Sequence, residues 1–447
     1  MFRASTITAK VAEIKTAIEA GGNEECERSR DDWKKISMNI AVIGESGVGK
    51  SSFINAIRRR TADDKGAAEI GATETTKEIR SYSHPGNKML LFWDLPGVGT
   101  DHYPRKTYLA DIKVDRYDFF LLIIAVRCTE NDTWLRNELR KRQKKYFFIR
   151  TKIGIDVGND WKAHRKTHNE KALIEKIRQD MAEHLRTKER EEVPIFLIDS
   201  HELKKFDFEK LEQQLIEHFS KQKKPALILS LHATSKEMIK LKVAELRSRI
   251  FWSAALSAAG SAIPIPGLSI VADITVITRE AMLYFKQLGL DSDSLEQYAS
   301  LYSADYTKMK LIVGGTYRAR AVSTITMDGM KSIVLVILAG SATSLTASAA
   351  GSVLAKVFLP VIGGLIASPA SFALTHKALN LILNKFEETA IKVMKCLEEV
   401  KNDNHTTEEA TGGEDAQNSA VQEELLSEEV AKVGVEDAQD AGGIHVE

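Results

Sequence analysis

The sequence predicts an α/β fold, with a mostly parallel sheet covered by helices on both faces, followed by a region built from helices alone. Between residues 36 and 222, short runs of Ile, Val, Leu and Phe without polar alternation are separated by amphipathic stretches. This is the pattern of strands that are buried on both faces and joined by helices. After residue 223 no such run returns. At 447 residues the chain is also too long for one ordinary core, so about two or three domains are expected.

The individual elements follow from the apolar pattern. Apolar residues recur at helical spacing between Ile7 and Ile18, so residues 1–35 are expected to hold a helix that packs on another part of the chain. The buried-strand pattern occurs at Asn39–Ile43, Met89–Trp93, Asp118–Val126, Tyr146–Arg150 and Pro194–Ile198. Helical patterns lie at Trp134–Lys145, Glu170–Leu185 and Phe206–Phe219.

The next part of the chain, residues 223–400, reads as helical. It contains a charged helical pattern at 235–250 and three long uncharged stretches, Ile250–Ala272, Ser332–Ala355 and Val357–His376. Each stretch is long enough to span a bilayer, but all are rich in Ala, Ser and Gly, and prolines interrupt the first and third. Two interpretations stay open: the core of a helical bundle, or hairpins that insert into a membrane.

Charge and cysteine content narrow the setting of the protein. Residues 401–447 carry 13 Asp and Glu against two Lys, which predicts an acidic disordered tail. The three cysteines lie far apart, which excludes a CxxC metal site and favours a reducing compartment. The start of the chain lacks the pattern of a signal peptide. The basic stretch Arg136–Lys145 is interpreted as a solvated helix face or a contact with anionic lipid, and no motif supports a nucleic-acid partner.

A glycine-rich segment directly after the first strand pattern matches GxxxxGK(S/T), the phosphate-binding P-loop. Its glycines let the backbone curl so that amide groups face the phosphates, and the following helix adds positive potential at its N-terminus. Lys50 is expected to reach the β- and γ-phosphates, and Ser51 to bind Mg²⁺. The predicted phosphate-binding residues are Gly44, Glu45, Ser46, Gly47, Val48, Gly49, Lys50, Ser51 and Ser52.

Two further segments carry groups that can respond to the γ-phosphate. A DxxG sequence ends the second apolar strand pattern, so Asp94 can hold magnesium through water and the amide of Gly97 can contact the γ-phosphate. Between this sequence and the P-loop, Thr76 directly precedes a strand-like segment at Lys77–Ser81 and is expected to close on the metal. The predicted metal ligands are Ser51, Thr76 and Asp94. Together the motifs favour a GTPase-like protein over metabolite kinases.

The segment expected to read the base departs from the usual pattern. Guanine is normally recognised by an Asp two residues after a Lys that follows a strand, but here Gly154 stands two residues after Lys152. A carboxylate on guanine N1 and N2 is what separates GTP from ATP. The hypothesis at this point is that Asp156 substitutes for the missing carboxylate. The predicted base contacts are Thr151, Lys152, Asp156, Asp199 and Ser200.

These segments, in this order, resemble the immunity-related GTPases, the interferon-inducible GTPases of vertebrates. The resemblance rests on GESGVGKSSFINAIR, ETT, FWDLPGVGT followed by YDFFLLI, FFIRTK, PIFLIDS and FDFEKLEQQL. In that family the helical segments on either side of the G domain form one all-α domain. The resemblance therefore implies a P-loop GTPase domain at 36–222 and a helical domain made from residues 1–35 and 223–400.

The resemblance also implies an activity and a setting. It implies hydrolysis of GTP to GDP and phosphate with Mg²⁺, slow in the isolated chain and faster in dimers or oligomers formed through the G domain. It implies an interferon-inducible protein of cell-autonomous immunity that is cytoplasmic and peripherally associated with intracellular membranes. Glu45 and Glu74 match glutamates that act at a nucleotide-facing dimer contact in the family. With Thr76 and Gly97 they form the candidate catalytic set.

No residue in these motifs is an evident candidate for orienting the water that attacks the γ-phosphate. Some small GTPases orient water with a Gln just after DxxG, but Val98 occupies that place and cannot do so. Two other interpretations therefore stay open. The chain could be a nucleotide-binding scaffold or regulator that hydrolyses little, as Gly154 and Val98 favour. It could also be an integral membrane protein carrying a G domain, as the uncharged stretches favour.

Overall fold

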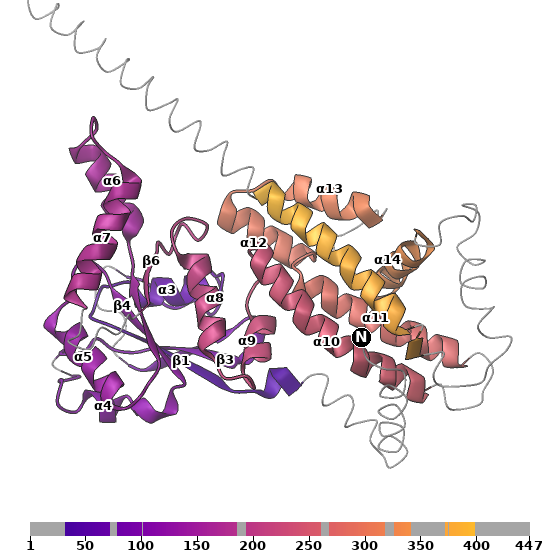
Figure 1. The fold of residues 1–447 in the computed structure, drawn as a ribbon, viewed down its shortest axis with the longest axis horizontal. Helices are drawn as coiled ribbons and strands as arrows, with labels where there is room; N and C mark the ends of the chain where they lie inside the picture. The colour runs from indigo at the N-terminus through magenta and orange to yellow at the C-terminus, as the bar shows by residue number, and fades with distance from the viewer. Residues whose placement is uncertain are drawn as a thin grey trace, which may run out of the picture. The chain divides into compact units, whose positions relative to one another are not determined.

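The computed structural model describes residues 32–71, 78–100, 102–185, 194–260, 268–317, 326–340, 372–373 and 375–397. The predicted N-terminal helix, the acidic tail and most of residues 341–376 lie outside this part, as do Glu74 and Thr76. The chain divides into two compact units, Met1–Lys392 and Val393–Glu447. The first unit contains the whole sheet and every labelled helix of Figure 1. Of the second unit, only the helical residues 393–397 are described.

Six strands form one sheet in the order β2-β3-β1-β4-β5-β6. They are β1 (Met38–Ile43), β2 (Arg80–His84), β3 (Asn87–Asp94), β4 (Phe119–Ile124), β5 (Tyr146–Arg150) and β6 (Ile195–Leu197). All neighbouring strands are parallel except β2, which pairs antiparallel with β3 at the edge. A strand forms at each of the five predicted runs, so the prediction of a mostly parallel sheet is confirmed. The strand-like segment predicted at Lys77–Ser81 corresponds to β2, which runs from Arg80 to His84.

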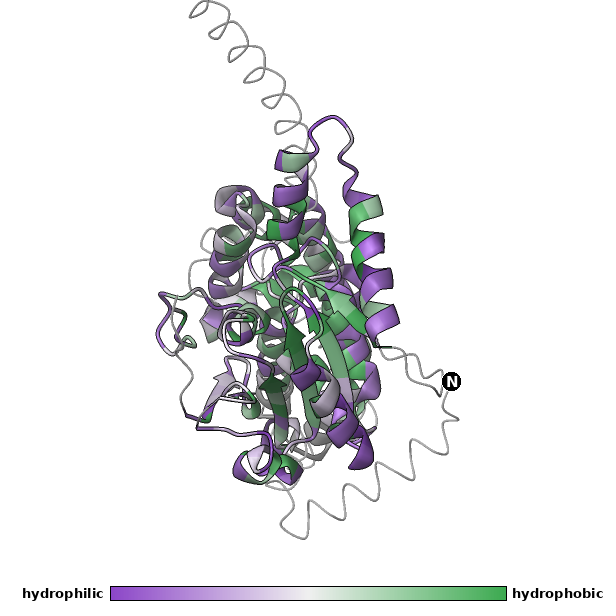
Figure 2. Ribbon diagram, turned by 90° about the vertical axis from the view of Figure 1, so that its left-hand side faces the viewer, coloured by the Kyte–Doolittle hydropathy of each residue, from purple (hydrophilic) through white to green (hydrophobic). Residues whose placement is uncertain are grey.

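Helices cover both faces of this sheet (Figure 1). They are α3 (Lys50–Ile57), α4 (Tyr108–Asp111), α5 (Glu130–Lys141), α6 (Ile153–Ala163), α7 (Glu170–His184) and α8 (Phe208–His218), with short 3-10 turns η2 (Asp32–Lys35) and η3 (Val114–Arg116). On one face Ala41 and Phe120 join an apolar cluster with Leu135 of α5. On the other face the ring of Phe119 stacks on that of Phe219, directly after α8. Figure 2 shows apolar strands in the interior, beneath helices with polar outer surfaces. Burial on both faces explains why the strand sequences are apolar without interruption.

Among the longer helices that cover the sheet, α5 and α6 differ most from the sequence prediction. α5 begins at Glu130 rather than Trp134, because Thr129 and Asp132 form a reciprocal capping box that starts the helix one turn earlier. It ends at Lys141, so Lys144 and Lys145 of the predicted basic helix lie beyond its end. The pattern did not predict α6, which begins directly after Lys152.

From residue 223 onward the described residues form helices and no strand, which confirms the helical C-terminal region. The helices are α9 (Lys224–Ser230), α10 (Lys236–Gly260), α11 (Leu268–Gln287), α12 (Ser292–Tyr302), α13 (Tyr306–Tyr317) and α14 (Met327–Gly340), and residues 375–397 are helical too. None of the helices in the described ranges is long and apolar enough to cross a bilayer. Ile250 and Ala254 of α10 and Ile333 of α14 are buried, so the described parts of two uncharged stretches contribute to the core.

Hydrogen bonds of the buried Arg59 join the sheet region to the helices that follow it. Arg59, just beyond the end of α3, donates from Nη2 to both carboxylate oxygens of Glu212 in α8 at 3.0 Å, and to Thr234 Oγ1 at 3.2 Å. Gln297 of α12 donates to the backbone carbonyl of Arg59. The helix that follows the P-loop is therefore bonded at its far end to residues of the helical region.

Candidate functional site

The P-loop occupies the turn between β1 and α3, at the centre of the sheet. β1 lies between β3 and β4, so the residues after Ile43 emerge where the carboxyl ends of three parallel strands meet. Gly49 precedes α3 with φ 94°, in the left-handed region that glycine adopts without strain. The predicted phosphate-binding residues, Gly44, Glu45, Ser46, Gly47, Val48, Gly49, Lys50, Ser51 and Ser52, thus form one loop and the first turn of α3.

Three chemical groups meet at this turn. The buried Lys50 donates from Nζ to the carbonyl of Glu45 at 2.8 Å, so its ammonium group lies over the loop. Ser51 donates from Oγ to Asp94 Oδ2 at 2.6 Å. Asp94 ends β3 and pairs in register with Val42 of β1, which places the carboxylate beside the start of α3.

The oxygens at this point suit a magnesium ion. Mg²⁺ prefers oxygen ligands, typically one or two protein groups together with waters and phosphate oxygens. The hydroxyl of Ser51 and the carboxylate of Asp94 supply such a pair, and both lie at the end of the P-loop nearest α3. Thr76, the other predicted ligand, lies outside the described residues.

The loop after β3 runs against the P-loop. A Cβ atom on Gly97 would lie 2.8 Å from the amide nitrogen of Ser46, so a glycine is needed for the two loops to approach this closely. The hydroxyl of Tyr108 donates to the carbonyl of Pro96 at 2.7 Å and so bonds this loop to α4. Val98 is buried and apolar, so its side chain supplies no group that could orient water.

Glu45 points toward α5. Its Oε1 accepts a hydrogen bond from Nδ2 of Asn131 at 3.1 Å, and the same Nδ2 lies 3.5 Å from the carbonyl of Val98. Arg105 donates from Nε to Asn131 Oδ1 at 3.0 Å. Asn131 therefore connects the P-loop, the loop after β3 and Arg105. Sequence analysis did not identify this residue, because a polar residue in the first turn of a helix carries no sign of a contact with a distant loop.

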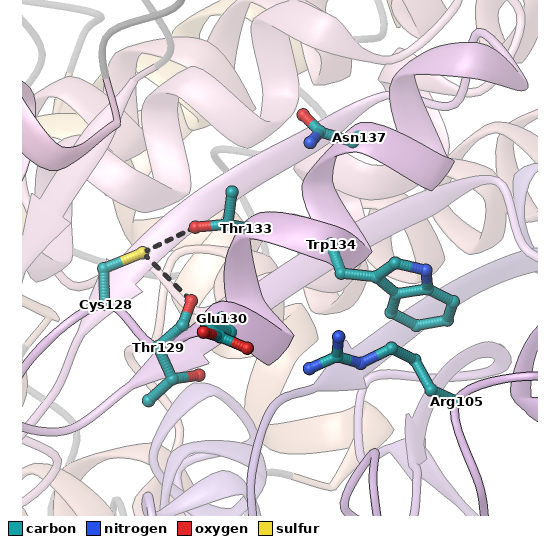
Figure 3. A pocket seen from close by; sticks show the side chains of 7 residues that line it. All are labelled: Arg105, Cys128, Thr129, Glu130, Thr133, Trp134 and Asn137. Carbon is teal, nitrogen blue, oxygen red and sulfur yellow. Dashed lines mark hydrogen bonds between the residues drawn. The ribbon is translucent and has the colours of Figure 1, made fainter.

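Beside this contact lies an open hollow of about 470 Å³ (Figure 3). Its lining residues are Arg105, Cys128, Thr129, Glu130, Thr133, Trp134 and Asn137. Burial raises the pKa of the Cys128 thiol, and its sulfur lies 3.7 Å from Thr133 Oγ1. Burial therefore disfavours the thiolate of Cys128, which is the reactive form of cysteine.

The predicted base-contact segment crosses the P-loop. Thr151 donates from Oγ1 to the carbonyl of Val48 at 2.7 Å, and Lys152 donates from Nζ to the carbonyl of Gly47 at 2.9 Å. These two bonds tie the end of β5 to the phosphate loop. They leave the aliphatic part of Lys152 alongside the loop, as expected for a lysine that packs along a base.

Two acidic residues lie near this segment, Asp156 of the hypothesis and Asp199. Asp156 lies in the first turn of α6 and accepts a hydrogen bond from Arg150 Nη2 at 2.6 Å, although burial keeps the pKa of its carboxyl above the ordinary value. Asp199, which follows β6, accepts from the amide of Gly154 at 3.1 Å. Ser200 is half-buried next to it. The sequence analysis did not predict that Asp199 and Gly154 lie close together. One indication in the sequence is that an acidic residue follows the last strand while a glycine occupies the position where the usual motif has an aspartate.

Comparison with known proteins identifies the family. Residues 11–351 match the sequence model described as Interferon-inducible GTPase (IIGP). The chain belongs to the interferon-inducible GTPase family. This membership confirms the resemblance stated above.

Three relatives give the extent of the similarity. Interferon-gamma-inducible GTPase 10 of Mus musculus is 36% identical over 280 residues, 62% of this chain and 67% of the relative. T-cell-specific guanine nucleotide triphosphate-binding protein 2 of Mus musculus is also 36% identical, over 60% of this chain and 64% of the relative. Interferon-inducible GTPase 5 of Rattus norvegicus is 31% identical over 89% of this chain and 85% of the relative. The chain thus spans about two thirds of the two mouse proteins and more of the rat protein.

Solved structures that resemble the chain are more distant. The FeoB G-domain from Methanococcus jannaschii is 16% identical, with 40% of this chain and 95% of that chain covered and a TM-score of 0.23. NFeoB from S. thermophilus bound to GDP, AlF4⁻ and K⁺ is 15% identical, with 80% and 100% covered and a TM-score of 0.28. At these scores the likeness adds nothing to the sheet order and site geometry given above.

Proposed function

We propose that this member of the interferon-inducible GTPase family binds GTP with Mg²⁺ and hydrolyses it to GDP and phosphate. The observation that carries the proposal is the meeting of Lys50, Ser51 and Asp94 at the carboxyl ends of β1 and β3. A polyphosphate placed there would find a cation, metal-binding oxygens and loop amides at the start of a helix. These are the groups that phosphoryl transfer requires.

Each group has a distinct part in this proposal. Magnesium, when bound by Ser51, Asp94 and Thr76, would neutralise charge on the phosphates. Lys50 stabilises negative charge on the β- and γ-phosphates, and the amide of Gly97 contacts the γ-phosphate. In the reaction the oxygen of a water molecule bonds to the γ-phosphorus, the bond from that phosphorus to the bridging oxygen breaks, and GDP, phosphate and a proton leave.

The test is a nucleotide titration of Lys50→Ala. Removing the ammonium group should weaken GTP binding at least tenfold, which corresponds to about 1.4 kcal/mol or more. Lys88→Ala is a suitable control, because Lys88 is exposed near the start of β3, at the opposite end of that strand from Asp94. Equal GTP affinity in wild type and Lys50→Ala would overturn the assignment of the phosphate site.

We also propose that turnover depends on self-assembly through the G domain. Val98 is buried and cannot orient water, so a single chain should hydrolyse GTP slowly. Glu45 and Glu74, acting across a contact between two copies, would position the water or contact the partner's ribose. Turnover per chain should then rise with protein concentration, and Glu45→Ala should flatten the rise. Constant turnover over a wide concentration range would instead favour the second candidate, a nucleotide-binding scaffold or regulator.

The setting we propose is the cytoplasm, with peripheral and reversible association with intracellular membranes. The support is the uncharged composition of residues 332–376, where Lys356 is the single charged side chain. Liposome flotation of the full chain with GDP and with a GTP analogue tests this, and we expect stronger binding with the analogue. Equal flotation in both states would contradict coupling to nucleotide, and resistance to alkaline carbonate would favour integral insertion.

A further inference from the structure

We propose that Asp199 reads the guanine base, in place of the carboxylate that Gly154 lacks. This inference rests on the proposed function, since it assigns the base specificity of the same nucleotide site. It differs from the hypothesis drawn from the sequence, in which Asp156 had this part.

The position of the Asp199 carboxylate is the main observation. A Cβ atom built on Gly154 would lie 2.7 Å from Asp199 Oδ2. The oxygens of an aspartate lie about 2.4 Å from its own Cβ, given ordinary bond lengths and angles. One oxygen of Asp199 therefore lies about as close to Cβ of residue 154 as the oxygens of an aspartate at 154 would lie.

The fold explains why the carboxylate reaches this place. β5 and β6 are parallel neighbours with Arg150 in register with Leu197, so both chains leave the sheet at the same edge. Backbone hydrogen bonds continue past the strands, from the amide of Ile198 to Arg150 and from the amide of Ile153 to Ile198. Asp199 thus emerges beside the start of α6, and the lack of a side chain at Gly154 leaves room for it.

The hydrogen bonds of Asp199 orient the carboxylate and leave acceptor capacity. Oδ2 accepts from the amide of Gly154 at 3.1 Å, and Oδ1 accepts from the amide of His201 at 2.8 Å. A carboxylate has about four lone-pair sites, so each oxygen can accept one further bond. Two parallel acceptors match the N1–H and N2–H donors of guanine, whereas adenine presents an unprotonated N1 at the corresponding position.

The other acidic residues near Gly154 are less suited to this part. Asp156 is held by Arg150 at 2.6 Å and belongs to the first turn of α6. Glu202 has an oxygen 3.4 Å from the Cβ position of residue 154, but its side chain is exposed and pairs with Lys205 at 3.5 Å. Asp156 and Glu202 therefore serve as matched controls for Asp199.

A purely structural part for Asp199, as an acceptor for the first amides of α6, makes a different prediction. Asp199→Asn keeps a side-chain oxygen that can accept from Gly154 but replaces the second acceptor with an amide donor. Xanthine carries a carbonyl where guanine carries its 2-amino group, so an Asn at 199 would donate to that carbonyl and accept from N1–H. Base reading by Asp199 thus predicts a change of preference from GTP to xanthosine triphosphate, which a structural part does not.

The experiment measures the affinity of the full chain for GTP, ATP, inosine triphosphate and xanthosine triphosphate. The variants are wild type, Asp199→Asn, Asp156→Asn and Glu202→Gln. We expect wild type to bind GTP at least tenfold more tightly than ATP or inosine triphosphate, which lacks the 2-amino donor. Asp199→Asn should lose at least tenfold in GTP affinity and gain in affinity for xanthosine triphosphate, and the two control variants should keep the wild-type order.

Each alternative outcome has a definite meaning. Retained GTP preference in Asp199→Asn, or a switch in Asp156→Asn instead, overturns the inference. Equal binding of GTP and inosine triphosphate by the wild type overturns it as well, and this measurement needs no variant to fold. Equal binding of GTP and ATP by the wild type, with loss of both in Lys50→Ala, would overturn base reading by Asp199 but support the proposed phosphate site. Binding of no nucleotide by the wild type would overturn the proposed function itself.

Discussion

Replacement of Glu212 by Ala tests the buried ion pair between α8 and Arg59, which follows α3. Arg59 and Glu212 each expose about 2% of their surface, so the change leaves a guanidinium group buried without its counter-charge. Both hydrogen bonds from Arg59 Nη2 to the carboxylate at 3.0 Å are lost, while those from Nη1 to Ala56 O and from Nη2 to Thr234 Oγ1 remain. Removing one partner of a buried ion pair costs about 3–5 kcal/mol. Because these bonds remain, we expect a cost of about 3 kcal/mol, the lower end of that range.

Urea unfolding followed by tryptophan fluorescence measures this cost. The double variant Arg59→Met with Glu212→Leu removes both charges and should be more stable than Glu212→Ala, because no uncompensated charge stays buried. Glu69→Ala removes an exposed pair with Arg80 at 3.2 Å and should leave the unfolding midpoint almost unchanged. A Glu212→Ala protein as stable as wild type, or a double variant less stable than Glu212→Ala, would refute this account of the contact.

Three further predictions concern other parts of the molecule. Gly97→Ala introduces a Cβ 2.8 Å from the amide nitrogen of Ser46 and should separate the loop after β3 from the P-loop. We expect the ratio of GTP-analogue affinity to GDP affinity, measured by titration, to fall about tenfold. An unchanged ratio would contradict the close approach of the two loops. Burial, reinforced by the charge of Lys242, lowers the pKa of His84 to about 3. Since the unfolded chain takes up this proton near pH 6.5, the free energy of unfolding should fall as the pH drops from 6.5 toward 3, by about 2 kcal/mol at pH 5. His84→Asn should therefore make the urea unfolding midpoint less sensitive to acid. Equal acid sensitivity of the midpoint in the variant and the wild type would refute this. Thr129→Ala removes the cap of α5 and should cost about 1 kcal/mol in unfolding free energy, with Thr133→Ser, inside the same helix, as a milder comparison; no loss would show that the cap is redundant.

The sheet could be predicted because its strands are buried on both faces. Every residue of β4, Phe119–Ile124, is buried, and such a run cannot be confused with a solvated helix. Helix boundaries were harder, because they depend on caps rather than on apolar spacing. α5 starts at a capping box of polar residues that the apolar pattern does not include. α6 was not predicted because Gly154 and Gly158 lower its intrinsic helix propensity, and it forms where the chain leaves β5.

The phosphate site could also be predicted, because its residues lie in short contiguous motifs of the chain. The P-loop lies within one turn, and Asp94 follows from the end of the next strand in the sheet. Contacts between separate crossovers could not be predicted, since they depend on the register of the strands and on where each loop turns. Asn131 against Glu45 and Asp199 against Gly154 are both contacts of this kind.

The two departures from the usual GTPase motifs, at Gly154 and Val98, have different physical consequences. We propose that a neighbouring strand supplies the missing base-reading carboxylate, because the ends of parallel β5 and β6 place Asp199 Oδ2 2.7 Å from a Cβ atom built on Gly154. A missing water-orienting group after Gly97 has no such replacement among the described residues, since Val98 is buried and the nearby Glu45 is bonded to Asn131. We therefore expect nucleotide affinity to be a property of one chain, and we propose that turnover depends on a group outside the described residues. If that group comes from a second copy, dilution should lower turnover per chain while GTP affinity stays constant.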